Sequence, residues 1–398
     1  MKSSYCVPTN FQEKYINEII TLNQTHQSKV VELYGTTPTS FVGHVREPIS
    51  VPKINKKELI THVEYLHKHE LKFNLTANTI FLDNKESTEK GKKKLDDFFK
   101  EIIASKIDSV TLANPYLIKF ANQNYPALKI KSSCGIEATT VENIKKLDSL
   151  GLETIVLNRK LNREFYILAQ LDKRLLNKLE LVVNSKCNHE CLFSTNHALL
   201  SGKSSQTEKK LGNFTYPYYS ILCAAETMAS PEEFIKSPWI RPEDIKEYNK
   251  IGIYNFKLDG RGKNEFNLLK VIDAYLEGNY AGNLLDLIGH QKLKQIDLKI
   301  DNKKLNGFLE FFKNKPPCTI TNCSKCTYCS KIAQRAISFN EAKRKTELKK
   351  LNLITACLTS NKFNPNYAHD HAFWKKIMQS SESAGPFQLV ENYSTRAE

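Results

Sequence analysis

The chain has 398 residues, enough for one large core with an appended module, and its 40% hydrophobic and 25% charged residues are ordinary for a globular protein. This composition excludes fibrous and intrinsically disordered classes. No stretch approaches the roughly 20 consecutive apolar residues of a transmembrane helix, and residues 1–20 lack the apolar core of a secretory signal. We therefore expect a cytoplasmic protein without a membrane span.

The net charge of +15 raises the question of a nucleic-acid partner, because Lys and Arg side chains gain affinity by displacing counterions from phosphates. Much of the excess charge is lysine in the amphipathic segments 90–100 and 341–350. Such segments are typical of solvated helix faces. RNA therefore stays an alternative partner that the charge alone does not predict.

Short β-branched runs alternate along the chain with segments that have the residue spacing of amphipathic helices. The runs that predict strands are residues 29–34, 72–75, 109–112, 128–131, 153–157, 180–184 and 254–258. The segments that predict helices are residues 56–69, 87–105, 115–124, 140–150 and 162–178. This alternation indicates an α/β fold with parallel strands, and we expect a (β/α) TIM-barrel-like domain. An open doubly wound sheet also fits, but no G-x-G-x-x-G follows the first predicted strand.

The alternation breaks after Cys191, where a polar segment and then an aromatic-rich segment follow. It resumes near Arg241, because the sequence Arg-Pro-Glu-Asp places a proline and two acids where a helix begins. We therefore expect a barrel over residues 1–289 with an inserted segment at about 193–250. Residues 290–398 change in composition and are expected to form a cysteine-rich C-terminal extension and tail.

Polar residues at the ends of the predicted strands are the candidates for the active site, because the strand-to-helix loops of a barrel gather at one face. Arg46 and Arg261 could bind a carboxylate or phosphate with their guanidinium groups, or form salt bridges between loops. His197 could transfer a proton near neutral pH, although a packed or surface histidine is the alternative. These three are the catalytic candidates. The candidates for substrate binding are Asn78, Asn114, Asn158, Asn162, Arg163 and Lys257.

A first group of cysteines begins with Cys187-Asn-His-Glu-Cys191, directly after a predicted strand, and Cys223 follows further along the chain. In a reducing compartment, clustered thiols bind metal more often than they form disulfides. We therefore interpret these three as metal ligands, with buried packing as the alternative. Cys134, at the end of an earlier strand, is the economical fourth ligand. The alternative is that Cys134 is simply packed in the interior. Substrate or water would then occupy the iron that lacks a cysteine ligand.

A second group comprises Cys318, Cys323, Cys326 and Cys329, spaced C-x4-C-x2-C-x2-C after a double proline. The close spacing resembles ferredoxin-like ligation of an iron–sulfur cluster. Zinc is the alternative, because four cysteines also form structural zinc sites, although zinc ribbons separate two C-x2-C pairs by a loop. One cysteine of this second group could instead complete the first site. The sequence is therefore consistent with either one 4Fe-4S cluster or two.

Three ordered segments carry a family resemblance. They are Leu181-Val-Val-Asn-Ser-Lys-Cys187-x3-Cys191-Leu-Phe, Phe234-Ile-Lys-Ser-Pro-Trp-Ile-Arg-Pro-Glu-Asp244 and Ile251-Gly-Ile-Tyr-Asn-Phe-Lys-Leu-Asp-Gly-Arg261. Together they resemble the peptidase U32 (collagenase-like) family. The resemblance implies a (β/α) barrel. It also implies relation to branches that hydroxylate a quinone precursor or RNA bases without oxygen, with a 4Fe-4S cluster on four cysteines. Here the C-x3-C spacing and the additional cysteine group depart from those branches.

These observations lead us to expect an iron–sulfur oxidoreductase, with oxygen-independent hydroxylation of a small-molecule, biosynthetic or RNA substrate as its reaction. Such an enzyme needs an organic substrate and an electron donor, and a homologous partner subunit is a further expectation. A U32-type peptidase is the first alternative, although the chain has no H-E-x-x-H or G-x-S-x-G motif. A zinc-stabilised nucleic-acid-binding protein is the second.

Overall fold

The computed structural model describes residues 2–46, 48–207, 217–260, 265–289, 291–318, 322–323 and 325–360. Eight parallel strands form one sheet in the order β5-β4-β3-β2-β1-β8-β7-β6. They are β1 (Ser4–Pro8), β2 (Lys29–Gly35), β3 (Lys72–Ala77), β4 (Ser109–Leu112), β5 (Lys129–Ser132), β6 (Ile155–Val156), β7 (Leu179–Val182) and β8 (Asn255–Lys257). The outer strands β5 and β6 meet through a parallel bridge between Lys131 and Thr154. The sheet therefore closes into a barrel.

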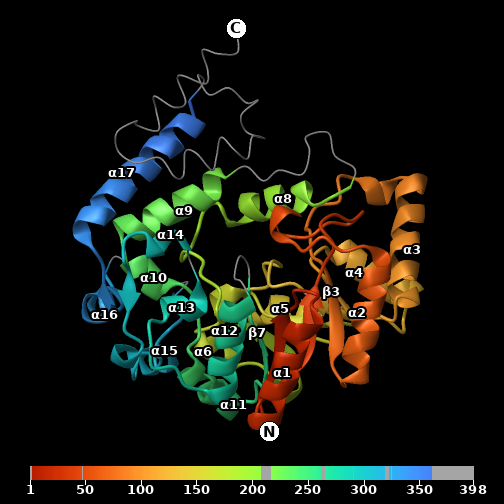
Figure 1. Cartoon of the computed structure of the whole chain (residues 1–398), viewed down its shortest axis with the longest axis horizontal. Coiled ribbons are helices and arrows are strands. Elements are labelled where there is room, and N and C mark those ends of the chain that lie inside the picture. Colours follow the sequence, from red (N-terminus) through yellow and green to blue (C-terminus); the bar gives the residue numbers. More distant parts are fainter. Residues whose placement is uncertain are drawn as a thin grey trace.

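Helices connect successive strands and cover the outside of the barrel (Figure 1). They are α1 (Glu13–Thr25), η1 (Pro48–Ser50), α2 (Lys56–Lys68), η2 (Lys85–Ser87), α3 (Glu89–Ala104), α4 (Pro115–Asn124), α5 (Val141–Asp148), η3 (Arg159–Leu161), α6 (Phe165–Leu168), α7 (Lys173–Lys178) and α12 (Glu265–Glu277). None of the described helices combines the length and apolarity needed to cross a bilayer. The expectation of a TIM-barrel-like fold is confirmed.

The structure contains all seven predicted strands and adds β1, which the sequence analysis missed. The prediction of one continuous helix over residues 162–178 was wrong, because this segment forms the two short helices α6 and α7. The side chain of Asp172 accepts a hydrogen bond from the Leu175 backbone N–H at 2.8 Å. This cap fixes a new helix start inside the segment that the periodicity alone predicts as continuous.

In the described part of the connection between β7 and β8, which omits residues 208–216, there are four helices and a short 3-10 turn instead of one crossover helix. They are α8 (Ser194–Ser204), α9 (Tyr218–Ala229), α10 (Glu232–Lys236), η4 (Pro242–Asp244) and α11 (Ile245–Lys250). In Figure 1, α8 and α9 lie along the top of the view, whereas α11 lies at the bottom near the N-terminus. Helix η4 begins directly after Arg241, where the sequence predicts a helix start.

The C-terminal elements pack against this connection. They are α13 (Leu285–Ile288), α14 (Gln291–Lys294), β9 (Lys299–Ile300), η5 (Lys303–Leu305), α15 (Glu310–Lys313), α16 (Tyr328–Ala336), β10 (Ile337–Ser338) and α17 (Glu341–Leu358). Helix α17 packs on α9, α16 packs on α10, and β9 pairs with β10 in antiparallel orientation. The domain boundary at residue 290 stays a prediction, because the extension and the insertion share one packed surface.

The interior of the barrel contains ionised side chains at positions where many barrels have apolar layers. Lys131 on β5 lies 2.5 Å from a carboxylate oxygen of Glu32 on β2 and 3.0 Å from one of Glu180 on β7. Lys257 on β8 lies 4.0 Å from Glu180. The four side chains are all buried. Two lysines and two glutamates therefore balance their charges across the centre of the barrel.

The start of α2 offers a local stability test. Asn55 and Glu58 form a capping box, in which each side chain accepts a hydrogen bond from the other residue's backbone N–H, at 3.0 and 2.7 Å. We expect Asn55→Ala to lower the free energy of unfolding by about 1 kcal/mol. Gln12→Ala is the matched control at the start of α1, where the side chain makes no capping hydrogen bond. Equal urea midpoints for the two variants would contradict the assignment.

Candidate active site

Four cysteine side chains line one cavity of about 140 Å³ at the carboxyl end of the barrel. Cys134 follows β5, Cys187 and Cys191 follow β7, and Cys318 comes from the C-terminal extension. We call this space the thiol cavity. Residues that are far apart in sequence therefore present thiols to a single space.

A hydrogen bond and an unusual backbone conformation position the two segments that bring in these thiols. Both carboxylate oxygens of the buried Glu164 accept from the backbone N–H of Cys318, at 3.0 and 3.1 Å. In the loop from Cys187 to Cys191, Glu190 adopts a positive φ of 48°, a conformation that non-glycine residues rarely adopt. This left-handed residue turns the chain so that both cysteines of the loop reach the cavity.

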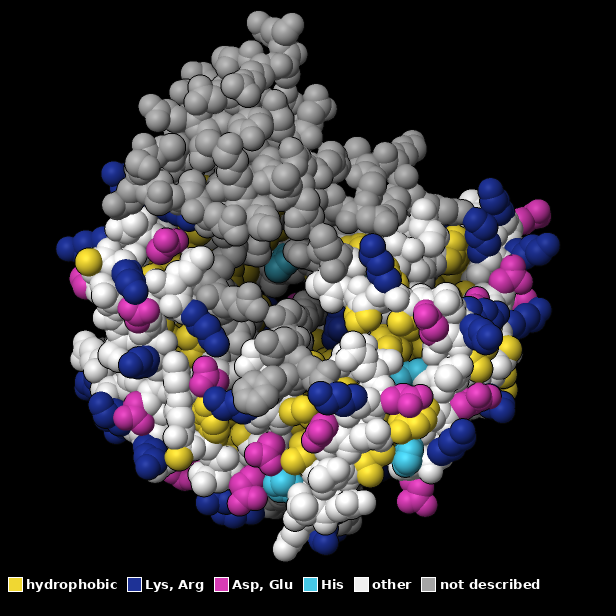
Figure 2. Space-filling view, in the orientation of Figure 1, with side chains coloured by type: hydrophobic (Ala, Val, Ile, Leu, Met, Phe, Trp, Pro, Cys, Tyr) yellow, Lys and Arg dark blue, Asp and Glu magenta, His cyan; other side chains and the backbone are white. Residues whose placement is uncertain are grey.

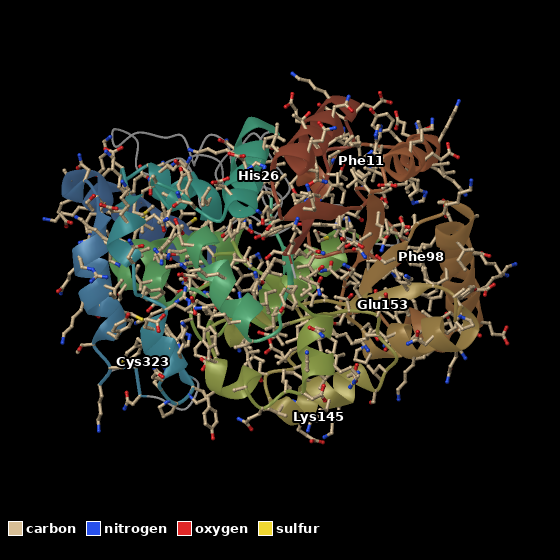
Figure 3. All side chains as sticks on the ribbon, turned by 90° about the horizontal axis from the view of Figure 1, so that it is seen from below. Phe11, His26, Phe98, Lys145, Glu153 and Cys323 are labelled. Carbon is tan, nitrogen blue, oxygen red and sulfur yellow. The ribbon has the colours of Figure 1, made fainter. Side chains whose placement is uncertain are left out.

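The remaining candidate cysteines lie around the cavity or away from it. The Cys223 sulfur accepts a hydrogen bond from the Lys186 ammonium at 3.4 Å. Cys326 and Cys329 are partly buried, and burial raises the pKa of Cys329 to about 12. Cys323 is exposed and lies at the periphery of the molecule (Figure 3). None of these four lines the thiol cavity.

The spacing of the thiols distinguishes between kinds of metal site. Among the described residues, one group of Cys, His, Asp or Glu side chains has three ligand atoms within 4.8 Å of one another. This group is Cys6, Glu32 and Glu180, inside the barrel, and it includes none of the cavity cysteines. The thiols of the cavity are therefore spread more widely than the ligands of one zinc ion. In a 4Fe-4S cluster each of four thiolates binds a different iron, so a cluster tolerates a wider spread of thiols than a single zinc ion does. Four cysteines around one space are compatible in number and kind with such a ligand set.

A second, smaller pocket of about 60 Å³ opens at the centre of the barrel mouth. We call it the mouth pocket; its lining includes Tyr34, Arg46, Thr76, Asn78, Ser133, Cys134, Arg159, Lys257 and Asp259. Lys257 lies over the Tyr34 ring at 4.0 Å from the ring centre, and the Arg46 guanidinium lies 5.1 Å from it. Cation–π contacts therefore gather two positive charges on one aromatic ring. Figure 2 shows a hollow near the centre of the view, with Lys or Arg side chains at its edge.

Arg159 and Cys134 line both cavities, so the thiol cavity and the mouth pocket share a wall. Arg159 donates a hydrogen bond to the Ser185 hydroxyl at 2.7 Å. Burial alone would lower the pKa of Arg159, but the neighbouring Cys134 and Cys187 raise it above its usual value. This guanidinium therefore stays positive between the two cavities.

Five of the predicted non-cysteine residues line one of these two cavities. Arg46, Asn78 and Lys257 line the mouth pocket, whereas Asn158 and Arg163 line the thiol cavity. Asn78 accepts from the Val45 backbone N–H and donates to the Ser133 hydroxyl, at 3.0 and 3.2 Å. Asn158 accepts from the Lys160 backbone N–H at 3.0 Å, so part of its polar capacity caps η3.

The other predicted residues lie elsewhere or have backbone partners. Asn114 caps α4, and the exposed His197 stacks on Tyr219; neither is in the described lining of the thiol cavity or the mouth pocket. Asn162 is buried and donates to the carbonyls of Val182 and Pro238, at 2.8 and 2.7 Å.

Arg163 combines a place in the cavity lining with a second set of contacts. Its buried guanidinium donates to the carbonyls of Ile235, Ser237 and Trp239, which fixes the segment after α10. Arg261 lies outside the described residues.

Several residues of the site escaped the sequence analysis. Arg159 follows β6 closely, so its place at a strand end was a usable signal. Tyr34 and Thr76 lie inside strands, and their side-chain direction depends on the register of the closed barrel. The arrival of Cys318 in the thiol cavity could not be read from cysteine spacing alone.

Comparison with known proteins identifies the family. The model of Peptidase family U32 matches residues 45–280, which is more than half of the chain. The chain belongs to peptidase family U32. The resemblance found in the sequence segments is therefore confirmed.

Among individual U32 relatives, the chain is 29% identical over 323 residues to "Uncharacterized protease MJ1657" of Methanocaldococcus jannaschii. The match covers 81% of this chain and 93% of that protein. The solved structure of the U32 peptidase Mk0906 matches 66% of this chain and 94% of that one, with 13% identity and a TM-score of 0.48. A chitinase from Bacteroides thetaiotaomicron matches 70% and 99%, with 12% identity and a TM-score of 0.35. Structural similarity at this level carries no information on activity.

Proposed function

We propose that this U32 protein is an iron–sulfur enzyme that modifies an organic substrate by oxidoreduction, with oxygen-independent hydroxylation as the reaction. One observation carries the proposal. Thiols from the β5 loop, the β7 loop and the C-terminal extension line one cavity, and that cavity shares a wall with a cationic pocket at the barrel mouth. In this proposal the cofactor site and the substrate site are adjacent, at the face where barrel enzymes have their active sites.

Cys134, Cys187, Cys191 and Cys318 would hold the cluster. A bound 4Fe-4S cluster supplies electron transfer or activation of a coordinated substrate. The protein's own groups act around it. Arg159 holds positive charge against the thiolates, and Glu164 positions the Cys318 backbone. Arg46 and Lys257 orient the substrate in the mouth pocket, and the walls of the narrow pocket exclude bulk water.

Metal and sulfide analysis of anaerobically purified full-length protein tests the proposal. We expect about four irons with matching acid-labile sulfide per chain, if one cubane occupies the thiol cavity. About twice that content would place a second cluster on the remaining late cysteines. Zinc without iron would overturn the redox function and favour the zinc-stabilised nucleic-acid-binding protein, whose RNA affinity would fall steeply with salt.

A peptidase is the second candidate, because the family name and the name of the M. jannaschii relative describe proteases. Cys187 and His189 both line the thiol cavity and could form a nucleophile and base. In the described structure, however, neither Cys187 nor Cys191 is hydrogen-bonded to a histidine. Burial also lowers the pKa of His189. Hydrolysis of unstructured peptides by iron-free protein, lost in Cys187→Ala, would favour the peptidase.

A further inference from the structure

The mouth pocket has an excess of positive charge. Its lining includes three cationic side chains, Arg46, Arg159 and Lys257, and one carboxylate, Asp259. The charge of Lys257 is partly balanced by Glu180 at 4.0 Å, deeper in the barrel. Arg46 makes no ion pair with a described residue, and its guanidinium lies over the Tyr34 ring. The pocket therefore attracts negative charge from solution.

The same pocket contains hydrogen-bond donors without partners. The Arg46 guanidinium has five N–H donors, none of which is bonded to a described residue. Thr76 is only 8% exposed, and its hydroxyl has no hydrogen-bond partner within the described structure, although the residue lines the pocket. A buried hydroxyl without a partner is costly, so its position facing a cationic pocket points to a ligand that accepts hydrogen bonds.

The size of the pocket limits the ligand. A volume of about 60 Å³ corresponds to about four to six water-sized spaces. A carboxylate or phosphate group fits this volume, whereas an aromatic ring system needs the larger thiol cavity across the shared wall of Cys134 and Arg159. Arg guanidinium groups bind such oxyanions bidentately.

We propose that the mouth pocket binds an oxyanion group, a carboxylate or a phosphate, of the substrate, and that Arg46, Lys257 and Thr76 are its donors. This inference rests on the proposed function only where it identifies the ligand as the substrate of the enzyme. The anion site itself requires only the residues of the mouth pocket. Its occupant extends from there toward the thiol cavity.

Calorimetric titration of the full-length, anaerobically purified protein with inorganic phosphate and with malonate tests the proposal. We expect saturable binding of at least one probe, and the tighter probe identifies the class of oxyanion. Arg46→Gln should weaken binding more than about tenfold, because it removes a charge-assisted hydrogen bond. Thr76→Val keeps the shape of the side chain and should weaken binding about fivefold, the effect of losing an uncharged donor.

Arg174→Gln is the matched control, because it removes an exposed guanidinium on α7, which precedes β7 and so lies at the opposite end of the barrel. This variant should bind like the wild type. Absence of binding of both probes, or unchanged affinity in both Arg46→Gln and Thr76→Val, would overturn the anion site. Equal unfolding midpoints of all variants exclude misfolding as the cause of a loss.

The two proposals fail in different ways. If the protein contains no iron but still binds a probe through Arg46, the anion site is supported and the iron–sulfur function is wrong. A protein with about four irons that binds neither probe would retain the cluster and overturn the anion site. Titration of Cys187→Ser separates them in one sample, because the mouth pocket should keep its affinity when the cluster is lost.

Discussion

Replacing Cys187 with serine is expected to abolish iron binding and the visible absorbance of the anaerobically purified protein. The loss should be near complete, because a serine hydroxyl is a poor ligand for iron in a cluster that four thiolates hold. The barrel should still fold, since Cys187 is only partly buried and lies in a loop after β7. Iron and sulfide content together with far-UV circular dichroism measure both outcomes.

The other cysteines identify the ligand set. Cys318→Ser and Cys134→Ser should each lower the iron content strongly, because both side chains line the thiol cavity. Cys323→Ser is the matched control and should retain iron, because Cys323 is exposed at the periphery. Full iron content in Cys187→Ser, or loss of iron in Cys323→Ser alone, would show that the cluster has other ligands. Loss of iron in Cys223→Ser but not in Cys134→Ser would show that Cys223, and not Cys134, is the fourth ligand.

Lys131→Met is expected to lower the free energy of unfolding at neutral pH by about 3–5 kcal/mol, the usual cost of removing one partner from a buried ion pair. The ammonium of Lys131 lies 2.5 Å from Glu32 and 3.0 Å from Glu180, with all three side chains almost fully buried. Without it, two buried carboxylates face one remaining lysine. Urea denaturation measures the effect.

Lys100→Met is the control for this lysine, because Lys100 forms an exposed pair with Asp96 at 2.6 Å. Exposed pairs contribute about 0–1 kcal/mol, so the control should unfold nearly like the wild type. Equal losses in the two variants would contradict a structural role for the barrel charges.

The pH dependence has a definite sign. Burial raises the pKa of Glu32, but the charge and hydrogen bond of Lys131 outweigh it, so the folded-state pKa lies below the ordinary value. Glu32 therefore contributes stability above its unfolded pKa, and this contribution is lost as the pH falls through the lower, folded pKa. In Lys131→Met the pKa of Glu32 should rise instead. The stability difference between wild type and variant should accordingly narrow as the pH falls, and a constant difference would contradict this account.

Much of the barrel was predictable because β-branched runs and amphipathic segments follow one another with few interruptions. Strand β1 escaped because its five residues, Ser-Tyr-Cys-Val-Pro, include only one β-branched residue and end in proline. The barrel charges were visible as single ionisable residues within apolar runs, for example Glu32 between Val31 and Leu33. The pattern did not indicate that they would meet, since their pairing depends on barrel closure.

The site was predictable where a motif lies in one segment and not where segments converge. Cys187 and Cys191 stand together after a strand, and they line the thiol cavity as a pair. Cys318 belongs in sequence to a compact group of four and keeps Cys323 and Cys329 as charged neighbours, yet it also lines the thiol cavity with the first pair. The place of Cys318 depends on the packing of the C-terminal extension against the barrel, including the contact from Glu164, which cysteine spacing does not indicate.

The place of β1 between β2 and β8 governs the order in which the chain can fold. Tyr5 and Cys6 pair with Phe256 and Lys257, and the Tyr5 hydroxyl donates to the Tyr275 carbonyl at 2.9 Å. These contacts join residues about as far apart as the barrel sequence allows. During synthesis β1 can pair with β2 at once, but its other edge stays unpaired until β8 has been made, so the charged interior stays open to water until then. Pairing of such long range makes closure the slow step of folding.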